Sequence, residues 1–345
     1  MWLSQEFGPG EAPKNDHIEE GVMKRSCLPL ALLLIVCGLR LGVTHTLAQP
    51  FPNRPIQLII PLPPGAQGDI SARILTEEMA RILGTQIIPV NKPGAALTLG
   101  TDAVVRSKKD GYTIGYTSSG AIVYARVINP ETVPYDPGKD LEPLGVHLFY
   151  PLTVTVQESS PWKTLPELVG YAKKNPGKLR VSTTGVGSTD HFNVGIIQSV
   201  TGAQFTHVPF KGGESVVTAL LGGHVEVTFD TLSKVLPHVE SGKLRVLVIS
   251  KKRAEFPNIP TLTELGYKQG MISAWFGFYA PTGIPEEARK ALVSAIEKAI
   301  NNPELKAKTE KLGFIVDYKP PAESRRLAAE DYERALSIAE KLGLR

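Results

Sequence analysis

Short apolar runs and longer amphipathic segments alternate along most of this chain. Residues 56–61 form a run rich in branched side chains and closed by prolines, which predicts a buried strand. Residues 69–83 then carry apolar side chains at helical spacing, with Gly84 as a stop signal, which predicts a helix. Strand, helix and strand in this order are typical of right-handed crossover units in a parallel sheet.

The same alternation continues to the end of the chain. Further strands are expected at residues 86–90, 112–117, 178–184, 205–209, 225–229, 244–249 and 314–318, and the chain is mostly helical after residues 275–280. Further helices are expected through Val104 and Val105 and at residues 164–175, 190–200, 214–221, 285–300, 303–312 and 322–342. Two sets of crossover units followed by a helical tail predict two α/β lobes. Ligands of such sheets bind at the carboxyl ends of the strands, and between two lobes that crevice becomes a cleft that a hinge can close.

The first fifty residues follow a different pattern. Met23-Lys24-Arg25 is basic, residues 27–39 form an apolar run too short to span a bilayer comfortably, and Thr46-Leu47-Ala48 supplies the small residues of a cleavage site. This layout predicts a cleavable secretory signal peptide at residues 23–48, and therefore a periplasmic protein. Residues 1–22 are polar and acidic, which is unusual ahead of an export signal. We interpret them as an N-terminal extension from a mis-assigned start, with Met23 as the true start.

Composition narrows the function classes. The chain has 345 residues, 42% hydrophobic and 21% charged, as in an ordinary globular protein, and its net charge of +4 is too weak to indicate nucleic-acid binding. Both cysteines, Cys27 and Cys37, lie inside the predicted signal peptide, so the mature chain needs neither a disulfide nor a metal-thiolate site. His191 and His207 lack companions at metal-ligand spacing. We therefore expect no metal and no cofactor.

Three predicted strand-to-helix junctions combine glycine with small polar residues: residues 61–69, 117–120 and 182–190. Glycine lets a backbone approach a ligand closely, and free amides at a helix start, together with Ser and Thr hydroxyls, can hold an anion. None of the three contains Lys or Arg, so the expected grip on an anion uses no cationic side chain. Singly, each loop is also an ordinary turn or helix cap of an α/β protein, and capping is the favoured role of Asp69.

These loops belong to an ordered set of motifs that covers nearly the whole mature chain. The set includes Phe51-Pro-Asn-Arg-Pro-Ile56, Pro63-Pro64-Gly65, Asn91-Lys-Pro-Gly94, Asp110-Gly-Tyr-Thr113, Thr184-Gly-Val-Gly-Ser188, His207-Val-Pro-Phe-Lys-Gly212, Ser241-Gly-Lys-Leu-Arg245 and Ala280-Pro-Thr-Gly283. Together these motifs resemble the substrate-binding proteins of tripartite tricarboxylate transporters, the Bug or TctC type. One departure matters: Ala66 stands where the family usually has the second of two glycines, and a positive φ there would shift the loop.

The resemblance implies the two-lobed type II, or Venus-flytrap, α/β fold of periplasmic binding proteins, with a mostly parallel sheet in each lobe. Lobe I would comprise residues 49–152 and 259–345, and lobe II residues 153–258. Carried over by position, the residues that face a carboxylate in the cleft are Pro64, Gly65, Ala66, Gln67 and Asp69 in one lobe and Thr184, Gly187, Ser188 and Thr189 in the other, with Ser118, Ser119 and Asp230 lining the rest.

The resemblance also implies a function. A monomeric receptor of this type captures a small carboxylate, either a di- or tricarboxylate or an aromatic acid, for the membrane subunits of a tripartite tricarboxylate-type transporter. A receptor that reports its ligand to a sensor kinase is the alternative with the same binding chemistry. A secreted α/β hydrolase would need a nucleophile, a base and an orienting acid. The chain has no G-x-S-x-G or H-E-x-x-H motif, and Ser188 with His191 lacks a third member in sequence, so we expect no enzyme.

Overall fold

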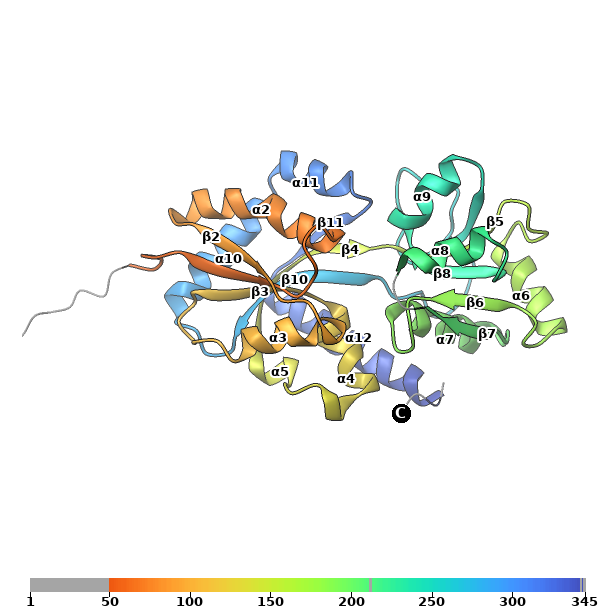
Figure 1. Cartoon of the computed structure of the whole chain (residues 1–345), viewed down its shortest axis with the longest axis horizontal. Coiled ribbons are helices and arrows are strands. Elements are labelled where there is room, and N and C mark those ends of the chain that lie inside the picture. The colour runs from red at the N-terminus through yellow and green to blue at the C-terminus, as the bar shows by residue number, and fades with distance from the viewer. Residues whose placement is uncertain (1–49, 211–212, 342, 344–345) are drawn as a thin grey trace, which may run out of the picture. The chain divides into compact units, whose positions relative to one another are not determined.

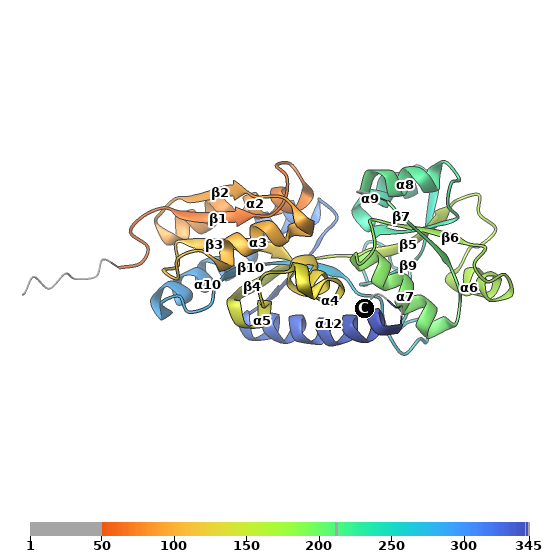
Figure 2. The ribbon, with the colours of Figure 1, turned by 60° about the horizontal axis from the view of Figure 1, so that its bottom comes forward.

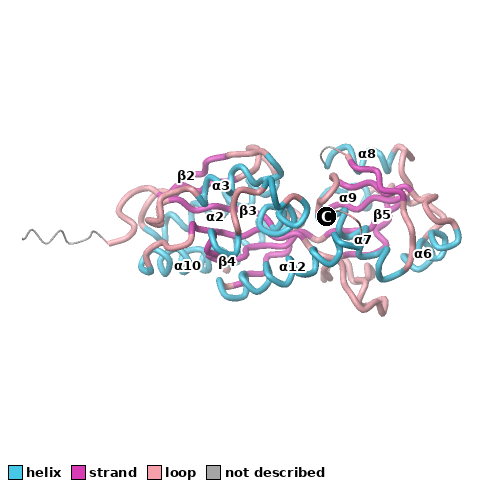
Figure 3. Tube along the Cα trace, turned by 90° about the horizontal axis from the view of Figure 1, so that it is seen from below, coloured by secondary structure: helices cyan, strands magenta, loops and turns pink. Residues whose placement is uncertain are grey.

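The computed structural model describes residues 50–210, 213–341 and 343. Within them the strands form two separate sheets, and helices flank the strands of both (Figures 1 and 3). The predicted signal peptide and N-terminal extension, residues 1–48, lie outside the described residues. Among the residues that are described, no helix is both long and apolar enough to cross a membrane.

The first sheet has six strands in the order β11-β4-β10-β3-β1-β2. Their bounds are β1 (Ile56–Ile60), β2 (Ile87–Asn91), β3 (Thr113–Ser118), β4 (Leu141–Tyr150), β10 (Ala274–Pro281) and β11 (Ile315–Lys319). β1 pairs in parallel with β2 and β3, whereas β10 is antiparallel to β3 and β4, and β11 is antiparallel to β4. Strands from both ends of the described chain therefore share this sheet.

The second sheet has five strands in the order β7-β6-β8-β5-β9. Their bounds are β5 (Leu152–Gln157), β6 (Arg180–Thr183), β7 (Thr206–Pro209), β8 (Val227–Thr231) and β9 (Leu244–Ile249). β6 is parallel to β7 and β8, and β5 is antiparallel to β8 and β9. The chain therefore builds this sheet from one continuous segment before it returns to the first sheet.

Both sheets are mixed, which refines the predicted α/β fold. Only β10, β11 and β5 run against the other strands of their sheets, so most strands share one direction, as expected. The antiparallel pairings of these three strands were not predicted. β5 follows β4 across the single residue Pro151, and β10 follows the return from the second sheet. Neither strand is preceded by the crossover helix that keeps neighbouring strands parallel.

Twelve helical elements of different lengths are relevant to the site. Their bounds are α2 (Gln67–Leu83), α3 (Thr98–Val105), η2 (Gly120–Tyr124), α4 (Ala125–Ile128), α5 (Pro137–Asp140), α6 (Leu165–Lys174), α7 (Thr189–Thr201), α8 (Gly213–Leu221), α9 (Leu232–Glu240), α10 (Glu286–Ile300), α11 (Pro303–Glu310) and α12 (Pro321–Lys341). The predicted helix at residues 164–175 is found as α6, with Thr164 as its N-cap, since the Thr164 hydroxyl accepts a hydrogen bond from the Glu167 amide. The sequence did not predict α9, because Pro237 interrupts its helical pattern.

The C-terminal helix α12 contacts elements that belong to both sheets. Figure 2 shows it as one long helix, which packs against β4 and α4 and also reaches α7. Its position on the first sheet is fixed by a buried hydrogen bond, in which Trp275 Nε1 donates to Asp331 Oδ2 at 2.8 Å. A second link joins α7 to the chain that returns from β9 to β10: the Asn193 side chain makes two hydrogen bonds to the backbone of Ile272.

Candidate functional site

A cleft of about 740 Å³ lies at the carboxyl ends of strands β1, β3, β6 and β8. It is lined by residues of the loops that follow these strands and by aromatic side chains, namely Leu62, Gly65, Ala66, Gln67, Gly68, Leu97, Ser118, Gly120, Tyr124, Ala125, Tyr150, Leu152, Thr184, Gly185, Val186, Gly187, Ser188, Thr189, Asp190, Asp230, Thr231, Lys234, Ala274 and Phe276. Both sheets contribute, so the three predicted junctions meet at one cleft. The strand ends of parallel units are the expected place for a ligand.

Nine of the twelve residues predicted for the site line this cleft: Gly65, Ala66, Gln67, Ser118, Thr184, Gly187, Ser188, Thr189 and Asp230. The structure places Pro64, Asp69 and Ser119 outside its lining. Pro64 is exposed on the loop, and Ser119 is buried with its hydroxyl accepting a hydrogen bond from the Trp275 amide. Three of the twelve residues carried over from the family therefore do not line the cleft.

Asp69 stabilises the first junction, residues 61–69, by hydrogen bonds, although it does not line the cleft itself. Its carboxylate accepts hydrogen bonds from the Gly65 amide, from Asn91 Nδ2 and from Arg73 Nε, at 2.8–2.9 Å. Burial alone would raise the pKa of Asp69, but the hydrogen bonds from Asn91, Gly65 and Arg73 hold that pKa below its ordinary value. The favoured capping role of Asp69 is therefore wrong: Ala66 occupies the N-cap position of α2 without a side-chain cap hydrogen bond, and Asp69, at the third helical position, binds the amide of the loop residue Gly65.

Ala66 does not require the conformation that only glycine adopts easily. Its backbone has φ −61° and ψ 148°, whereas the positive φ of this loop, +82°, falls on Gly65. The first of the two glycine positions is therefore the one that needs glycine. The loop accommodates Ala66 without the shift that its presence in the sequence suggested.

The third of the three junctions, residues 182–190, leads into α7 with Ser188 as the N-cap residue. Ser188 Oγ accepts from the His191 amide at 3.2 Å, and the Gly187 amide donates to His191 Nδ1, also at 3.2 Å. The His191 ring stacks on His207, with 3.9 Å between the ring centroids. Burial, followed by the neighbouring His207, lowers the pKa of His191 to about 4, so the ring is neutral near pH 7. His191 thus supports the backbone of the loop.

The first turns of α2 and α7 both open into the cleft. Gln67 and Gly68 belong to α2, and Thr189 and Asp190 belong to α7, and all four line it. Amides in the first turn of a helix have no backbone acceptor within that helix, and the helix dipole gives this end a partial positive charge. Two helices from different sheets therefore present free N–H donors to the same space, which suits an anion.

Two buried carboxylates and one lysine lie in the same wall. Asp190 accepts from the amide and the hydroxyl of Thr184, at 3.2 and 2.5 Å, so both donors of Thr184 are already used. Asp230 Oδ1 accepts from the Thr231 amide at 2.7 Å and from Lys234 Nζ at 3.2 Å. Burial, and after it the charge of Asp230, raises the pKa of Asp190 to about 7. Burial likewise raises the pKa of Asp230.

The prediction that no cationic side chain lies near the bound anion is wrong, because Lys234 lines the cleft. It lines the cleft from α9, an element that the sequence did not predict, and its side chain is about 31% exposed. Asp230 belongs to β8 and Lys234 to the first turn of α9, so the pair spans a strand-to-helix junction and no helical spacing in the sequence signals it. The aromatic side chains of Tyr124, Tyr150 and Phe276 were also missed as lining residues.

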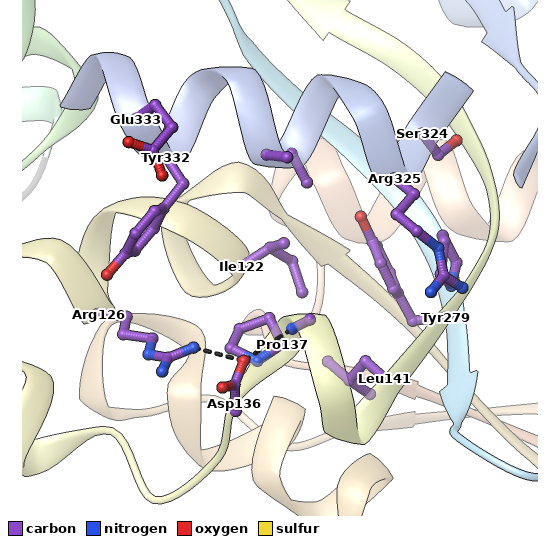
Figure 4. Close-up of a pocket in the computed structure, with 14 residues that line it drawn as sticks. Ile122, Arg126, Asp136, Pro137, Leu141, Tyr279, Ser324, Arg325, Tyr332 and Glu333 are labelled. Atoms are coloured by element: carbon purple, nitrogen blue, oxygen red, sulfur yellow. Dashed lines mark hydrogen bonds and ion pairs between the residues drawn. The ribbon is translucent and has the colours of Figure 1, made fainter. Parts of the chain in front are cut away.

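A second, smaller cavity of about 240 Å³ lies elsewhere on the first sheet, beside α12 (Figure 4). Figure 4 shows Tyr332 on α12 facing Arg126, which forms an ion pair with Asp136 at 2.5 Å. None of the residues predicted for the site lines this cavity. Within the described part of the chain, no group of three or more acidic, His or Cys side chains could hold a metal ion.

Two α/β sheets with a cleft at the ends of their strands are typical of two-lobed solute-binding receptors. The model of the tripartite tricarboxylate transporter family receptor, TctC, matches residues 71–344. The chain therefore belongs to this family of receptors.

Curated relatives agree with this assignment over nearly their whole length. The chain is 35% identical over 318 residues to the "UPF0065 protein in gbd 5'region" of Cupriavidus necator, which covers 91% of this chain and 95% of that protein. It is 30% identical to the protein BugT of Bordetella pertussis, covering 93% of this chain and 98% of that protein.

Solved structures share the fold. The periplasmic binding protein BugD is 28% identical, with a TM-score of 0.69, and the match covers 85% of this chain and 99% of that one. A Rhodopseudomonas palustris protein solved with adipate is 25% identical, with a TM-score of 0.73 and coverage of 85% and 98%. MatC of Rhodopseudomonas palustris, solved with bound malate, is 28% identical, with a TM-score of 0.69 and coverage of 84% and 99%.

Proposed function

We propose that this receptor binds a small carboxylate in the cleft at the strand ends, and that it delivers this ligand to the membrane subunits of a tripartite tricarboxylate-type transporter. The observation that carries the proposal is that α2 and α7, from different sheets, both begin at this cleft. The adipate and malate found in two similar structures favour a dicarboxylate over the other acids considered.

The proposed binding of the carboxylate depends on hydrogen bonds from the first residues of α2 and α7. A carboxylate accepts hydrogen bonds from backbone amides, and bonds to a charged acceptor are roughly twice as strong as neutral ones. The amides of Gln67 and Thr189 are well placed as donors, because each is the first residue of its helix. The Ser188 hydroxyl adds a donor, since its oxygen is already occupied as an acceptor by the His191 amide.

Export and closure complete the proposed cycle. The predicted signal peptide at residues 23–48 would deliver the mature chain to the periplasm as a monomer. Lobe I, residues 49–152 and 259–345, would close on lobe II, residues 153–258, around the ligand. The passages between the sheets at Pro151 and residues 250–273 are the natural hinge segments, because few residues there must change conformation.

An enzymatic function is not favoured by the contacts of the nearest catalytic pair. Ser188 Oγ accepts from the backbone amide of His191, and His191 Nδ1 accepts from the Gly187 amide. The imidazole is therefore engaged with the loop backbone rather than with the serine hydroxyl. A receptor for a sensor kinase would use the same cleft, and capture of the membrane partner by the purified receptor separates these two roles.

The test removes single backbone donors. Proline is tolerated at the first position of a helix, and it deletes only an amide that lacks a helical partner. Ala66 and Ser188, which precede the two positions, already have the extended backbone that proline requires before it. The variants Gln67→Pro and Thr189→Pro are therefore matched with Gln67→Ala and Thr189→Ala, which lose the side chain but keep the amide.

Calorimetric titration with malate, adipate, citrate and nicotinate gives the readout. Each proline variant should bind the preferred acid about tenfold more weakly than its alanine counterpart, because a hydrogen bond to a charged group contributes roughly 1.5–3 kcal/mol. Equal affinities of proline and alanine variants would show that these amides do not hold the ligand. Failure of every carboxylate, together with tight binding of a sugar or a cation, would refute the proposed function.

A further inference from the structure

Asp230, one of the residues that line the cleft, has a buried carboxylate oxygen that receives no hydrogen bond from the described residues. Asp230 is only about 1% exposed, and its Oδ2 is buried without a partner among the described residues. Its other oxygen, Oδ1, accepts two hydrogen bonds, from the Thr231 amide and from Lys234 Nζ. An unpaired buried acceptor is costly, by about 1–3 kcal/mol and more when it is charged, so this oxygen requires an explanation.

The other polar groups of the wall do not supply the missing donor. Asp190 takes both donors of Thr184, and Lys234 is directed to Oδ1. From the first sheet, Gln67 faces the same cleft; its side-chain oxygen accepts from Ser233 Oγ at 3.0 Å, and its NH₂ group makes no hydrogen bond to Oδ2. The only charged residues that line the cleft within the described chain are Asp190, Asp230 and Lys234. With both carboxylates ionised, this wall carries one negative charge in excess.

We propose that Asp230 Oδ2 accepts a hydrogen bond from the ligand, so that the cleft selects carboxylates that also carry a hydroxyl or ammonium group. The inference rests on the proposed function, because the helix starts hold the carboxylate while Asp230 reads the second group. An unsubstituted acid would leave Oδ2 without a donor. A donor-bearing acid satisfies this oxygen, and an ammonium group would in addition offset negative charge in the wall.

The test compares acids that share one carbon skeleton. Succinate, L-malate and L-aspartate form a four-carbon series, and glutarate, 2-hydroxyglutarate and L-glutamate form a five-carbon series. In calorimetric titrations at pH 7, a substituted acid should bind at least about tenfold more tightly than the unsubstituted acid of the same series, as expected for a site that loses a partner for a buried polar group.

Asp230→Asn is the informative variant. Because Lys234 and the Thr231 amide both donate to Oδ1, the amide oxygen of the asparagine must face them. Its NH₂ group then occupies the place of Oδ2 and offers a donor where the native residue offers an acceptor. The preference for the substituted acid should fall to about threefold or less, and the unsubstituted acid should bind as tightly as before or more tightly. Asp110→Asn, which removes a surface carboxylate paired with Arg54, is the matched control and should leave the preference unchanged.

The outcomes separate this inference from the proposed function. Equal affinities within each series for the native protein, or a preference that survives in Asp230→Asn, would overturn the selection by Asp230 while carboxylate binding stands. If no acid of either series binds, and adipate and citrate also fail, the proposed function itself fails. A thermal unfolding curve of Asp230→Asn that matches the native one shows that a lost preference is not a loss of fold.

Discussion

At the scale of single residues, Asp190 and Asp230 occupy a place that is unfavourable for two carboxylates. Both are buried, at about 4% and 1% exposure, in the wall of a cleft that we propose to bind an anion. Lys234 offsets one charge, and the pKa of about 7 for Asp190, raised by burial and then by Asp230, leaves that group partly protonated near neutral pH. The wall is therefore less repulsive to an anion than a count of its acidic residues suggests.

The raised pKa of Asp190 predicts a pH-dependent cost to stability. Below about pH 4 the carboxyl is protonated in both the folded and the unfolded state and costs nothing. Between about pH 4 and pH 7 the unfolded state is already ionised while the folded state keeps its proton, so the stability supplied by this group falls across this window and is lost once the pH rises through about 7. At pH 4 the free energy of unfolding of Asp190→Asn should therefore be similar to that of the native protein. At pH 8 the free energy of unfolding of the variant should be higher, by a difference on the order of 2 kcal/mol.

Urea unfolding at the two pH values measures this difference. Asp110→Asn, at an exposed ion pair, is the control and should show no such change with pH. If Asp190→Asn is destabilised equally at pH 4 and pH 8, then hydrogen bonding to Thr184, rather than the burial of charge, dominates at this position.

At the scale of elements, the loop before α7 depends on a glycine for two separate reasons. Gly187 has φ +76°, and a Cβ placed there would lie 2.8 Å from Ile128 Cγ1, at the end of α4. Gly223 has a similar φ, +70°, but a Cβ there meets nothing within 4 Å. The pair of glycines therefore separates backbone strain from steric contact.

Gly187→Ala should lower the free energy of unfolding by about 3 kcal/mol, whereas Gly223→Ala should lower it by about 1 kcal/mol. The value for Gly187→Ala includes the clash with Ile128, whereas the value for Gly223→Ala reflects only the positive φ. Denaturant unfolding measures both, and titration with the preferred acid should show weaker binding only for Gly187→Ala. Equal losses of stability would mean that the loop moves away from Ile128 freely.

Two buried hydrogen bonds anchor the helix α12 on the first sheet: the Val146 amide donates to Ser324 Oγ, and the Trp275 indole donates to Asp331. Trp275 is fully buried, and Asp331 supplies the acceptor for its indole N–H. Asp331→Ala should cost about 2 kcal/mol of stability, because the indole donor is then left unpaired inside the protein. Asp331→Asn keeps an acceptor oxygen and should stay within about 1 kcal/mol of the native protein. Similar losses in both variants, measured by urea unfolding, would show that the carboxylate charge rather than the acceptor matters.

The sequence predicted the elements that have a clear period and missed those that do not. The helix expected at residues 69–83 is found as α2, two residues longer at its start, and the three ligand loops follow β1, β3 and β6 as expected. The helix α9 escaped prediction because Pro237 lies within it, and Lys234 was lost with it as a site residue. The order of the strands was also out of reach, since β10 returns from far along the chain to lie between β3 and β4. Such pairings depend on long-range packing that no local pattern encodes.

At the scale of the whole described unit, the elements around the two sheets contact each other through residues of the cleft-lining loops and helix starts. Ser233, at the start of α9, donates to Gln67 at the start of α2, and Gly187 approaches Ile128. Together with Pro151 and the α12 contacts, these links limit how the sheets can move and leave the cleft as the place where a ligand adds new contacts. A ligand that bonds to both helix starts would therefore favour the closed arrangement.

A crystal structure of the receptor with the acid that titrates most tightly tests directly whether the two helix starts hold the ligand. One carboxylate of the ligand should lie at the N-termini of α2 and α7, with its oxygens within hydrogen-bonding distance of the Gln67 and Thr189 amides. A ligand held instead in the smaller cavity beside α12, or a carboxylate bonded only to side chains with both helix starts unoccupied, would contradict this binding mode.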